Sequence, residues 1–259
     1  MEAARLLKET LDFVRPLAQA ARNHPRRLQP EIKADGSLVT PVDHAIEAAF
    51  RPFALALTPG AGFWGEEEGY TPPTEAGFWV LDPIDGTSNF AFGQALWGVT
   101  GAFLQNGTVQ FGFLFLPDLG YELAAARGQG ATCNGNPMAP IPPGNIEPWQ
   151  LVGHGDSYAQ LAQATPGKMR HLGSYAAEVG LVALQHLRAT VTSRVKLYDC
   201  AGGVLICREL GAEIKNLDGT NWDESQWQDP IPCQPFVIAP ANSNVPYDRL
   251  PQLLLNHGR

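Results

Sequence analysis

Two aspartates, Asp82 and Asp85, lie three residues apart directly after the short apolar run Phe78-Trp79-Val80-Leu81. The aromatic and β-branched composition of that run predicts a buried strand, so Asp82 is expected at the strand's end. Pro83 removes a backbone donor and stiffens the turn, which lets Asp85 return beside Asp82. Two carboxylates this close repel each other and need a shared proton or a cation between them. Oxygen ligands on a turn suit a hard ion such as Mg²⁺.

The next residues, Gly86-Thr87-Ser88, offer backbone N–H groups and hydroxyls, which form a phosphate cradle if a helix begins there. Asp-Pro and Asp-Gly are also common turn dipeptides, so the stretch alone is equally consistent with an ordinary turn. An EF-hand loop is excluded because Gly86 follows the second acid and Ile84 occupies a ligand position. Haloacid-dehalogenase-like phosphatases have a similar turn with acids two residues apart, and the spacing of three counts against that class.

The composition sets the class of protein. The chain has 259 residues, 44% of them hydrophobic, which suffices for one large core or two modest domains. A net charge of −8 argues against nucleic acid as a partner, and no apolar run is long enough to span a membrane. The charged, amphipathic N-terminus does not resemble an export signal, so we expect a cytoplasmic protein with reduced thiols at Cys133, Cys200, Cys207 and Cys233.

The first half contains two predicted helices, over residues 2–23 and 41–57, with apolar faces. Thr40 is a suitable N-cap for the second helix, and Asp43 completes a capping box that accounts for this acid without any catalytic role. Glu66, Glu67 and Glu68 form either a solvated charge run or acids at a strand end. Strands are predicted near 97–104, 108–116 and 119–126, with a hairpin turn at Asn106-Gly107.

A proline-rich linker over residues 136–148 divides the chain into unequal halves. The second half alternates strands with helices, which predicts an α/β half packed on the mixed sheet of the first. Strands are expected near 149–154, 169–173, 190–195, 212–216 and 234–239, and helices near 156–164, 174–189, 199–210 and 246–256. Asp199 is a natural N-cap for the third of these helices.

Three separated segments carry a family resemblance: Gly65-Glu66-Glu67, Asp82-Pro83-Ile84-Asp85-Gly86-Thr87 and Tyr198-Asp199-Cys200-Ala201-Gly202. In this order they resemble the inositol monophosphatase-like family of Mg²⁺-dependent, lithium-sensitive phosphatases. The first two match that family's motifs letter for letter. The third matches in part, with Tyr198 for tryptophan and Gly202 for alanine. Upstream, Lys33, Asp35-Gly36-Ser37, Val39-Thr40 and Asp43 are similar to the family's mobile loop and following helix.

The resemblance implies a mixed α and β fold, a layered α/β/α/β/α sandwich of the inositol monophosphatase and fructose-1,6-bisphosphatase type. It implies one phosphatase domain over residues 1–259. The N-terminal half, 1–140, would carry most metal ligands, and the C-terminal half, 148–259, would carry Asp199 and the substrate-facing residues. A homodimer acting on a small phosphorylated metabolite, with no nucleic-acid or membrane partner, is also implied.

The family pattern further implies two or three Mg²⁺ ions per active site. Glu66, Asp82 and the Ile84 carbonyl would hold a first ion, and Asp82, Asp85 and Asp199 a second. Thr87 and Asp43 would orient the attacking water with Glu67 close by, and the amides of Gly86 and Thr87 would meet the phosphate. One ion would activate water and the other stabilise the leaving oxygen.

The chain departs from the family on the substrate-facing side, which comprises Gly173, Ser174, Tyr175, Thr192 and Arg194. Relatives that take inositol phosphates carry an acid where this chain has Thr192. Tyr175 adds bulk, and Arg194 adds a cation that either meets the substrate or pairs with a surface acid such as Glu178. The resemblance therefore supports the family's phosphatase chemistry for this chain better than it supports the specificity for inositol phosphates. The alternatives are a histidinol-phosphate, sugar-bisphosphate or nucleotide 3′-phosphate phosphatase, or an inactive metal- or phosphate-binding regulator, against which the full set of acids argues.

Overall fold

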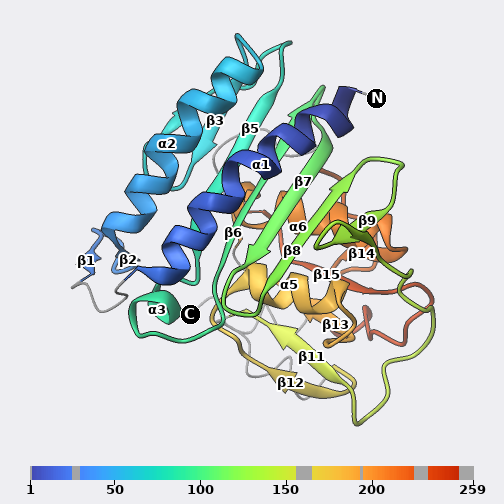
Figure 1. Cartoon of the computed structure of the whole chain (residues 1–259). Coiled ribbons are helices and arrows are strands. Elements are labelled where there is room, and N and C mark those ends of the chain that lie inside the picture. The colour runs from blue at the N-terminus through green and yellow to red at the C-terminus, as the bar shows by residue number, and fades with distance from the viewer. Residues whose placement is uncertain (1, 25–29, 156–164, 193–194, 225–232, 251–259) are drawn as a thin grey trace.

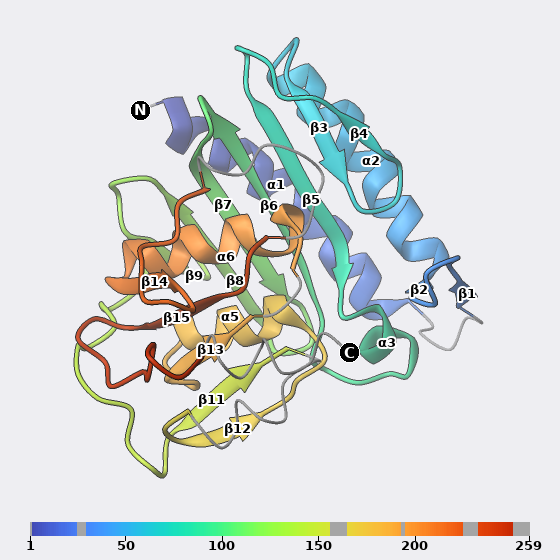
Figure 2. The same ribbon diagram turned by 180° about the vertical axis from the view of Figure 1, so that it is seen from behind.

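The computed structural model describes residues 2–24, 30–155, 165–192, 195–224 and 233–250. Helices α1 (Glu2–Asn23) and α2 (Pro41–Leu57) cover one face of an eight-stranded sheet (Figure 1). Helices α5 (Tyr175–Ala183) and α6 (Leu197–Glu209) lie between this sheet and a second, five-stranded one (Figure 2). This order matches the expected α/β/α/β layers. Of the two helices predicted over residues 156–164 and 246–256, only residues 246–250 lie within the described part of the chain.

The large sheet has the strand order β10-β9-β8-β7-β6-β5-β3-β4, and among these strands only β3 and β5 pair in parallel. Its strands are β3 (Gly62–Gly65), β4 (Tyr70–Thr71), β5 (Phe78–Asp85), β6 (Gly98–Gln105), β7 (Thr108–Leu116), β8 (Tyr121–Ala126), β9 (Ala131–Cys133) and β10 (Asn136–Pro137). The predicted turn between β6 and β7 is confirmed, because Asn106 and Gly107 both have positive φ, 51° and 70°.

Strand β5 is buried on both faces. Trp79 and Leu81 pack in the core shared with α1 and α2, whereas Val80 packs in the core shared with α5 and α6. A strand buried on both faces needs a continuous apolar run rather than an alternating one, which is the pattern of residues 78–81.

The small sheet has the order β12-β11-β13-β15-β14. Its strands are β11 (Leu151–His154), β12 (Lys168–Arg170), β13 (Ala189–Val191), β14 (Ala212–Asn216) and β15 (Phe236–Pro240). Strand β11 is parallel to both β12 and β13, and the chain passes first to one side of β11 and then to the other. A reversal of this kind opens a crevice outside the carboxyl ends of the strands, where ligands bind in open α/β sheets.

The helix boundaries agree with the sequence in the first half and differ in the second. Helix α5 ends at Ala183, six residues before its predicted end, because Gln185 adopts a left-handed φ of 62°. The amides of His186 and Gln185 then bond to the carbonyls of Leu181 and Val182, which is a Schellman termination. Helix α6 begins at Leu197, two residues before its predicted start.

Helix α6 approaches the large sheet backbone to backbone. A Cβ atom added at Gly202 would lie 2.6 Å from the Gly101 carbonyl oxygen, and one at Gly112 would lie 2.5 Å from the Gly202 Cα. The small residues at the start of α6 thus allow this close approach. No described helix is long and apolar enough to cross a bilayer.

Candidate active site

The acids of β5 face the same layer because the strand contains a bulge. Asp82 pairs with Thr100 and Asp85 with Gly98, so β5 carries one more residue than β6 between these pairs. Ile84 turns into the core shared with α1 and α2, and Asp85 returns to the α5 side. Acids three apart would point to opposite faces of a regular strand, and the extra residue removes that conflict. The predicted proximity of Asp82 and Asp85 therefore has a structural basis within the strand.

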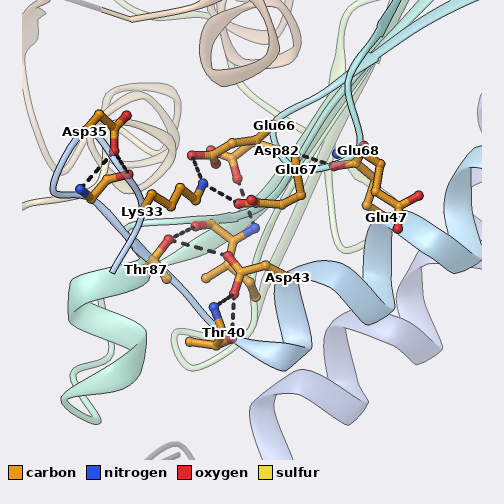
Figure 3. Close-up of polar contacts among 12 residues, drawn as sticks. Lys33, Asp35, Thr40, Asp43, Glu47, Glu66, Glu67, Glu68, Asp82 and Thr87 are labelled. Atoms are coloured by element: carbon orange, nitrogen blue, oxygen red, sulfur yellow. Dashed lines mark hydrogen bonds and ion pairs between the residues drawn. The ribbon is translucent and has the colours of Figure 1, made fainter. Parts of the chain in front are cut away.

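The residues after β3 bring a second pair of acids to the same edge. Gly65 pairs with Leu81 in parallel, so Glu66 follows beside Asp82. Of the two alternatives for this segment, a solvated charge run or acids at the end of a strand, the structure has the second. Lys33, from the loop between the two-residue strands β1 (Glu31–Ile32) and β2 (Leu38–Val39), donates to Glu66 Oε1 at 3.0 Å and Glu67 Oε1 at 2.6 Å (Figure 3). Burial opposes the charge on Lys33, but these two acids together raise its pKa.

Asp43 faces both the start of α2 and the active site. Its Oδ2 accepts hydrogen bonds from the backbone and side chain of Thr40, which confirms the capping box. Its Oδ1 lies 3.5 Å from the hydroxyl of Thr87, which also lies 3.0 Å from the Ile84 carbonyl (Figure 3). Burial raises the pKa of Asp43 to about 6 despite the Thr40 contacts. The carboxylate of Asp43 therefore caps α2 with one oxygen and faces Thr87 of the candidate site with the other.

Asp85 is held by the first turn of α5. The Ser174 hydroxyl and the Ala176 amide donate to Asp85 Oδ2, the latter at 2.7 Å. Burial raises the pKa of Asp85 to about 6, although these donors lower it. Asp85 is the last residue of β5, whereas Ser174 belongs to the second half of the chain, so the two halves are in contact at this carboxylate.

Asp199 was expected to be the N-cap of α6, and that prediction is wrong. The N-cap is Lys196, and Asp199 stands three residues on, where its Oδ2 accepts from the Lys196 amide at 2.6 Å. An acid at the third helical position accepts a hydrogen bond from the amide of the N-cap residue, which has no partner within the helix. Burial, Asp85 and Glu66 raise the pKa of Asp199 well above its ordinary value.

The carboxylates at this edge form one electrostatic cluster. Burial, then Glu66, Asp85 and Asp199, raise the pKa of Asp82 well above its ordinary value. Oxygen donors in a concentration of negative charge fit a hard divalent cation. In the described residues no three His, Cys, Asp or Glu side chains are already arranged to hold a metal ion. Asp82, Asp85 and Asp199 each accept a backbone amide through one oxygen, and a cation can bind through the other oxygen of each carboxylate.

The predicted phosphate cradle lies at the start of the short helix α3 (Thr87–Ala91). Gly86 is its N-cap with φ 84°, and a Cβ atom there would lie 2.7 Å from the Ser174 Cβ. Asn89 donates to the Leu172 carbonyl at 2.7 Å, which fixes the segment before α5 against α3. Gly173 and Ser174 thereby lie beside Gly86 and Asn89, and their role in binding substrate stays a prediction.

Two of the expected substrate contacts point into the core instead. Tyr175 is 8% exposed, and its ring packs edge-on against Phe236. Thr192 is 1% exposed, and its amide bonds to the Phe236 carbonyl. The hydroxyls of both residues are buried without a hydrogen-bond partner in the described structure. The expectation that Tyr175 faces the substrate is therefore wrong, because its position on α5 directs this side chain into the core.

From the sequence, Arg194 was expected either to meet the substrate or to pair with a surface acid such as Glu178. Arg194 lies outside the described residues. Glu178 is not a surface acid: it is 2% exposed, and its Oε2 accepts from the Thr190 hydroxyl at 2.7 Å. Burial raises the pKa of Glu178 to about 7.

Two histidines that the sequence analysis did not consider lie at one end of the small sheet. His154 ends β11, and His171 follows β12, at the carboxyl ends of the two parallel strands. Their ring centroids lie 5.5 Å apart, and His171 Nδ1 lies 3.1 Å from the His154 carbonyl oxygen. Another residue that was overlooked, Glu47, follows Asp43 by four positions on α2. Helical spacing would have placed it on the same face as Asp43.

Comparison with known proteins identifies the class. The model of the Inositol monophosphatase family matches residues 14–243. The chain therefore belongs to this family, and it is a phosphoric monoester hydrolase.

Individual relatives differ in their named activities. An inositol-1-monophosphatase of Mesorhizobium japonicum is 27% identical over 208 residues, covering 75% of this chain and 77% of the relative. A histidinol-phosphatase of Mycobacterium tuberculosis is 28% identical over 207 residues, covering 74% of this chain and 79% of the relative. The solved structure of an IMPase/NADP phosphatase complexed with Mg²⁺ and phosphate has a TM-score of 0.81 at 23% identity, covering 100% of this chain and 98% of the other. The layered fold is thus confirmed.

Proposed function

We propose that this protein is a Mg²⁺-dependent phosphomonoesterase that hydrolyses a small phosphorylated metabolite. The observation that carries the proposal is the meeting of Glu66, Asp82, Asp85 and Asp199, where burial together with Glu66 and Asp85 raises the pKa values of Asp82 and Asp199. Lys33 offsets part of the negative charge through its contact with Glu66, but a buried cluster with more carboxylates than cations is expensive for a fold to keep unless a metal ion binds there. Family membership supports the same metal.

Each acid has an assigned role in this proposal. Glu66 and Asp82, with the Ile84 carbonyl, hold a first Mg²⁺, and Asp82, Asp85 and Asp199 hold a second. A third ion is compatible with the family resemblance. When bound, the ions neutralise the phosphate and lower the pKa of water.

The remaining groups act on the water and the phosphate. The Thr87 hydroxyl has one proton, which it donates either to the Ile84 carbonyl or to Asp43. Its oxygen lone pair then orients the attacking water, and Asp43, with a pKa of about 6, takes up a proton through Thr87. Glu67 lies close by, held by Lys33. The amides of Gly86 and Thr87 meet phosphate oxygens as charge develops on them.

The preferred substrate in this proposal is not a neutral inositol monophosphate. Thr192 stands where inositol-specific relatives carry an acid, and in this chain its hydroxyl is buried. The groups available for the rest of the substrate are Gly173, Ser174, Arg194 and the imidazoles of His154 and His171. This set favours a substrate with a second anionic or planar group. Histidinol phosphate, a sugar bisphosphate and a nucleotide 3′-phosphate are the candidates to compare.

One screen tests the proposal. Phosphate release is measured with a generic aryl phosphate and a panel of phosphorylated metabolites, with and without Mg²⁺. We expect Mg²⁺-dependent hydrolysis and a best substrate other than inositol 1-phosphate. Binding of Mg²⁺ without hydrolysis of any substrate would favour the inactive regulator. We also propose a homodimer, which sedimentation velocity tests.

A further inference from the structure

Side chains of helix α2 bind the backbone of the segment at the end of β3. We call residues 65–69, Gly65-Glu66-Glu67-Glu68-Gly69, the acidic turn. The Glu47 side chain is fully buried beside it, with Oε2 accepting from the Glu67 amide and Oε1 from the Glu68 amide, both at 2.9 Å. Figure 3 shows Glu47 on the opposite side of the turn from Lys33. One carboxylate therefore binds two consecutive amides of the turn.

Arg51, one helical turn further along α2, binds the other end of the acidic turn. Its Nη2 donates to the carbonyls of Glu68 at 3.0 Å and Gly69 at 2.7 Å. The guanidinium lies over the Phe63 ring at 4.5 Å and is 3.7 Å from Glu47 Oε1. An acid and a base on one helix face thus satisfy the amide end and the carbonyl end of the same turn.

Gly65 makes room for this arrangement. A Cβ atom at Gly65 would lie 2.0 Å from Glu47 Oε1 and 2.4 Å from Oε2. Any side chain at position 65 would push the carboxylate away from the two amides. The glycine of this motif is therefore explained by the approach of Glu47, with no requirement for an unusual φ.

We propose that Glu47 is a positioning residue for the metal centre. By holding the backbone of the acidic turn, it sets where the carboxylates of Glu66 and Glu67 point. It is not itself a ligand, because it is buried and both of its oxygens bind backbone amides. The inference rests on the proposed metal site. It extends that site to a second layer in which α2 supplies Asp43 toward Thr87 and Glu47 toward the acidic turn.

The test uses Glu47→Gln in the full chain. A glutamine keeps the size but offers one acceptor and turns an NH₂ toward an amide. Loss of a charged hydrogen bond predicts that the Mg²⁺ concentration for half-maximal activity rises about tenfold or more. We expect kcat at saturating Mg²⁺ to change by less than about threefold, because no ligand is removed. Amide exchange in the peptide spanning residues 63–70, measured without Mg²⁺, should accelerate.

A matched control is Glu224→Gln. Glu224 is 5% exposed and binds Arg127 and Arg208, near the end of α6 opposite to Asp199. This variant should lower the melting temperature while leaving the Mg²⁺ dependence and the 63–70 exchange unchanged. If Glu47→Gln behaves like the control, the residue has only a structural role and the inference is wrong.

Two further measurements separate the possible failures. A wild type whose melting temperature and activity do not respond to Mg²⁺ would overturn the metal site and this inference with it. A wild type that responds, with a Glu47→Gln protein that responds at the same Mg²⁺ concentration, overturns the positioning role alone. Should the variant not fold, rapid exchange of the Glu67 and Glu68 amides in the wild type would still contradict the proposal.

Discussion

The hydroxyl of Ser174 donates to the carboxylate of Asp85 and, through the same oxygen, accepts from the Ala177 amide at 3.1 Å. One side chain therefore caps α5 and holds an acid of β5. The orientation of the second half relative to the first is tied to the orientation of a proposed metal ligand.

Replacing Ser174 with alanine should affect stability and turnover together. The lost cap costs about 1 kcal/mol of unfolding free energy, and Asp85 loses one of its donors. Urea denaturation and a Mg²⁺ titration of activity measure the two effects. Ser174→Thr keeps the hydroxyl and is the control. An alanine variant with unchanged activity would show that this contact does not position Asp85.

Asp82→Asn should abolish turnover, because this residue is assigned to both metals. Its melting temperature without Mg²⁺ should rise, since removing one charge relieves the repulsion within the cluster. Steady-state kinetics and thermal melts check both parts. A near-normal kcat would remove the two-metal mechanism.

Mg²⁺ should raise the melting temperature of the wild type, because it binds only the folded cluster of acids. Ca²⁺ should bind but support little turnover, since it is larger and accepts looser geometry. Lithium should inhibit, as the family resemblance implies. The absence of a melting shift at millimolar Mg²⁺ would count against an assembled site.

Stability without metal should fall as the pH rises from about 4 to about 7. Burial raises the pKa values of Asp43 and Asp85 to about 6 and of Glu178 to about 7, above the ordinary values of 3.8 and 4.5. The folded protein then binds more protons than the unfolded chain between these values, so deprotonation destabilises it. Urea denaturation across this range measures the slope. Glu178→Gln should reduce the slope, and an identical slope would contradict the assignment.

Arg194→Ala tests whether this cation meets the substrate. A direct contact predicts that KM for the best metabolite rises about tenfold, through loss of a charged hydrogen bond. Hydrolysis of a small aryl phosphate should be nearly unchanged. If the substitution changes the hydrolysis of both substrates equally, Arg194 contributes to folding or pairs with a surface acid and does not contact the substrate.

Local signals in the sequence predicted the elements best. Thr40, Pro41 and Asp43 specify the start of α2 through contacts within four residues, and the structure has this start. The turn at Asn106-Gly107 is equally local. By contrast, α5 ends at Ala183 because the nearby Gln185 has a positive φ, and this non-glycine residue carries no recognisable stop signal in the sequence.

The acids of the site were predictable as a set, but their surroundings were not. Glu47 reaches the acidic turn across twenty residues of sequence, and Ser174 reaches Asp85 across 89. Such contacts depend on how helices pack on the sheet. Tyr175 shows the same limit, because only the packing of α5 decides which side of that helix faces the core. Asp199 was expected at the wrong helix position because Lys196 is not a typical N-cap residue.

The contact between Gly112 and Gly202 limits which substitutions the chain can acquire. The family motif that this segment resembles has alanine at the position of Gly202, but here a methyl group would overlap the backbones of β6 and β7. That exchange therefore requires α6 to withdraw from the sheet, and Asp199 would move with it. The distance between α6 and the large sheet and the distances between Asp199 and the other acids must therefore change together. Introducing the family's alanine at position 202 would require a compensating change in the packing of α6 on the sheet.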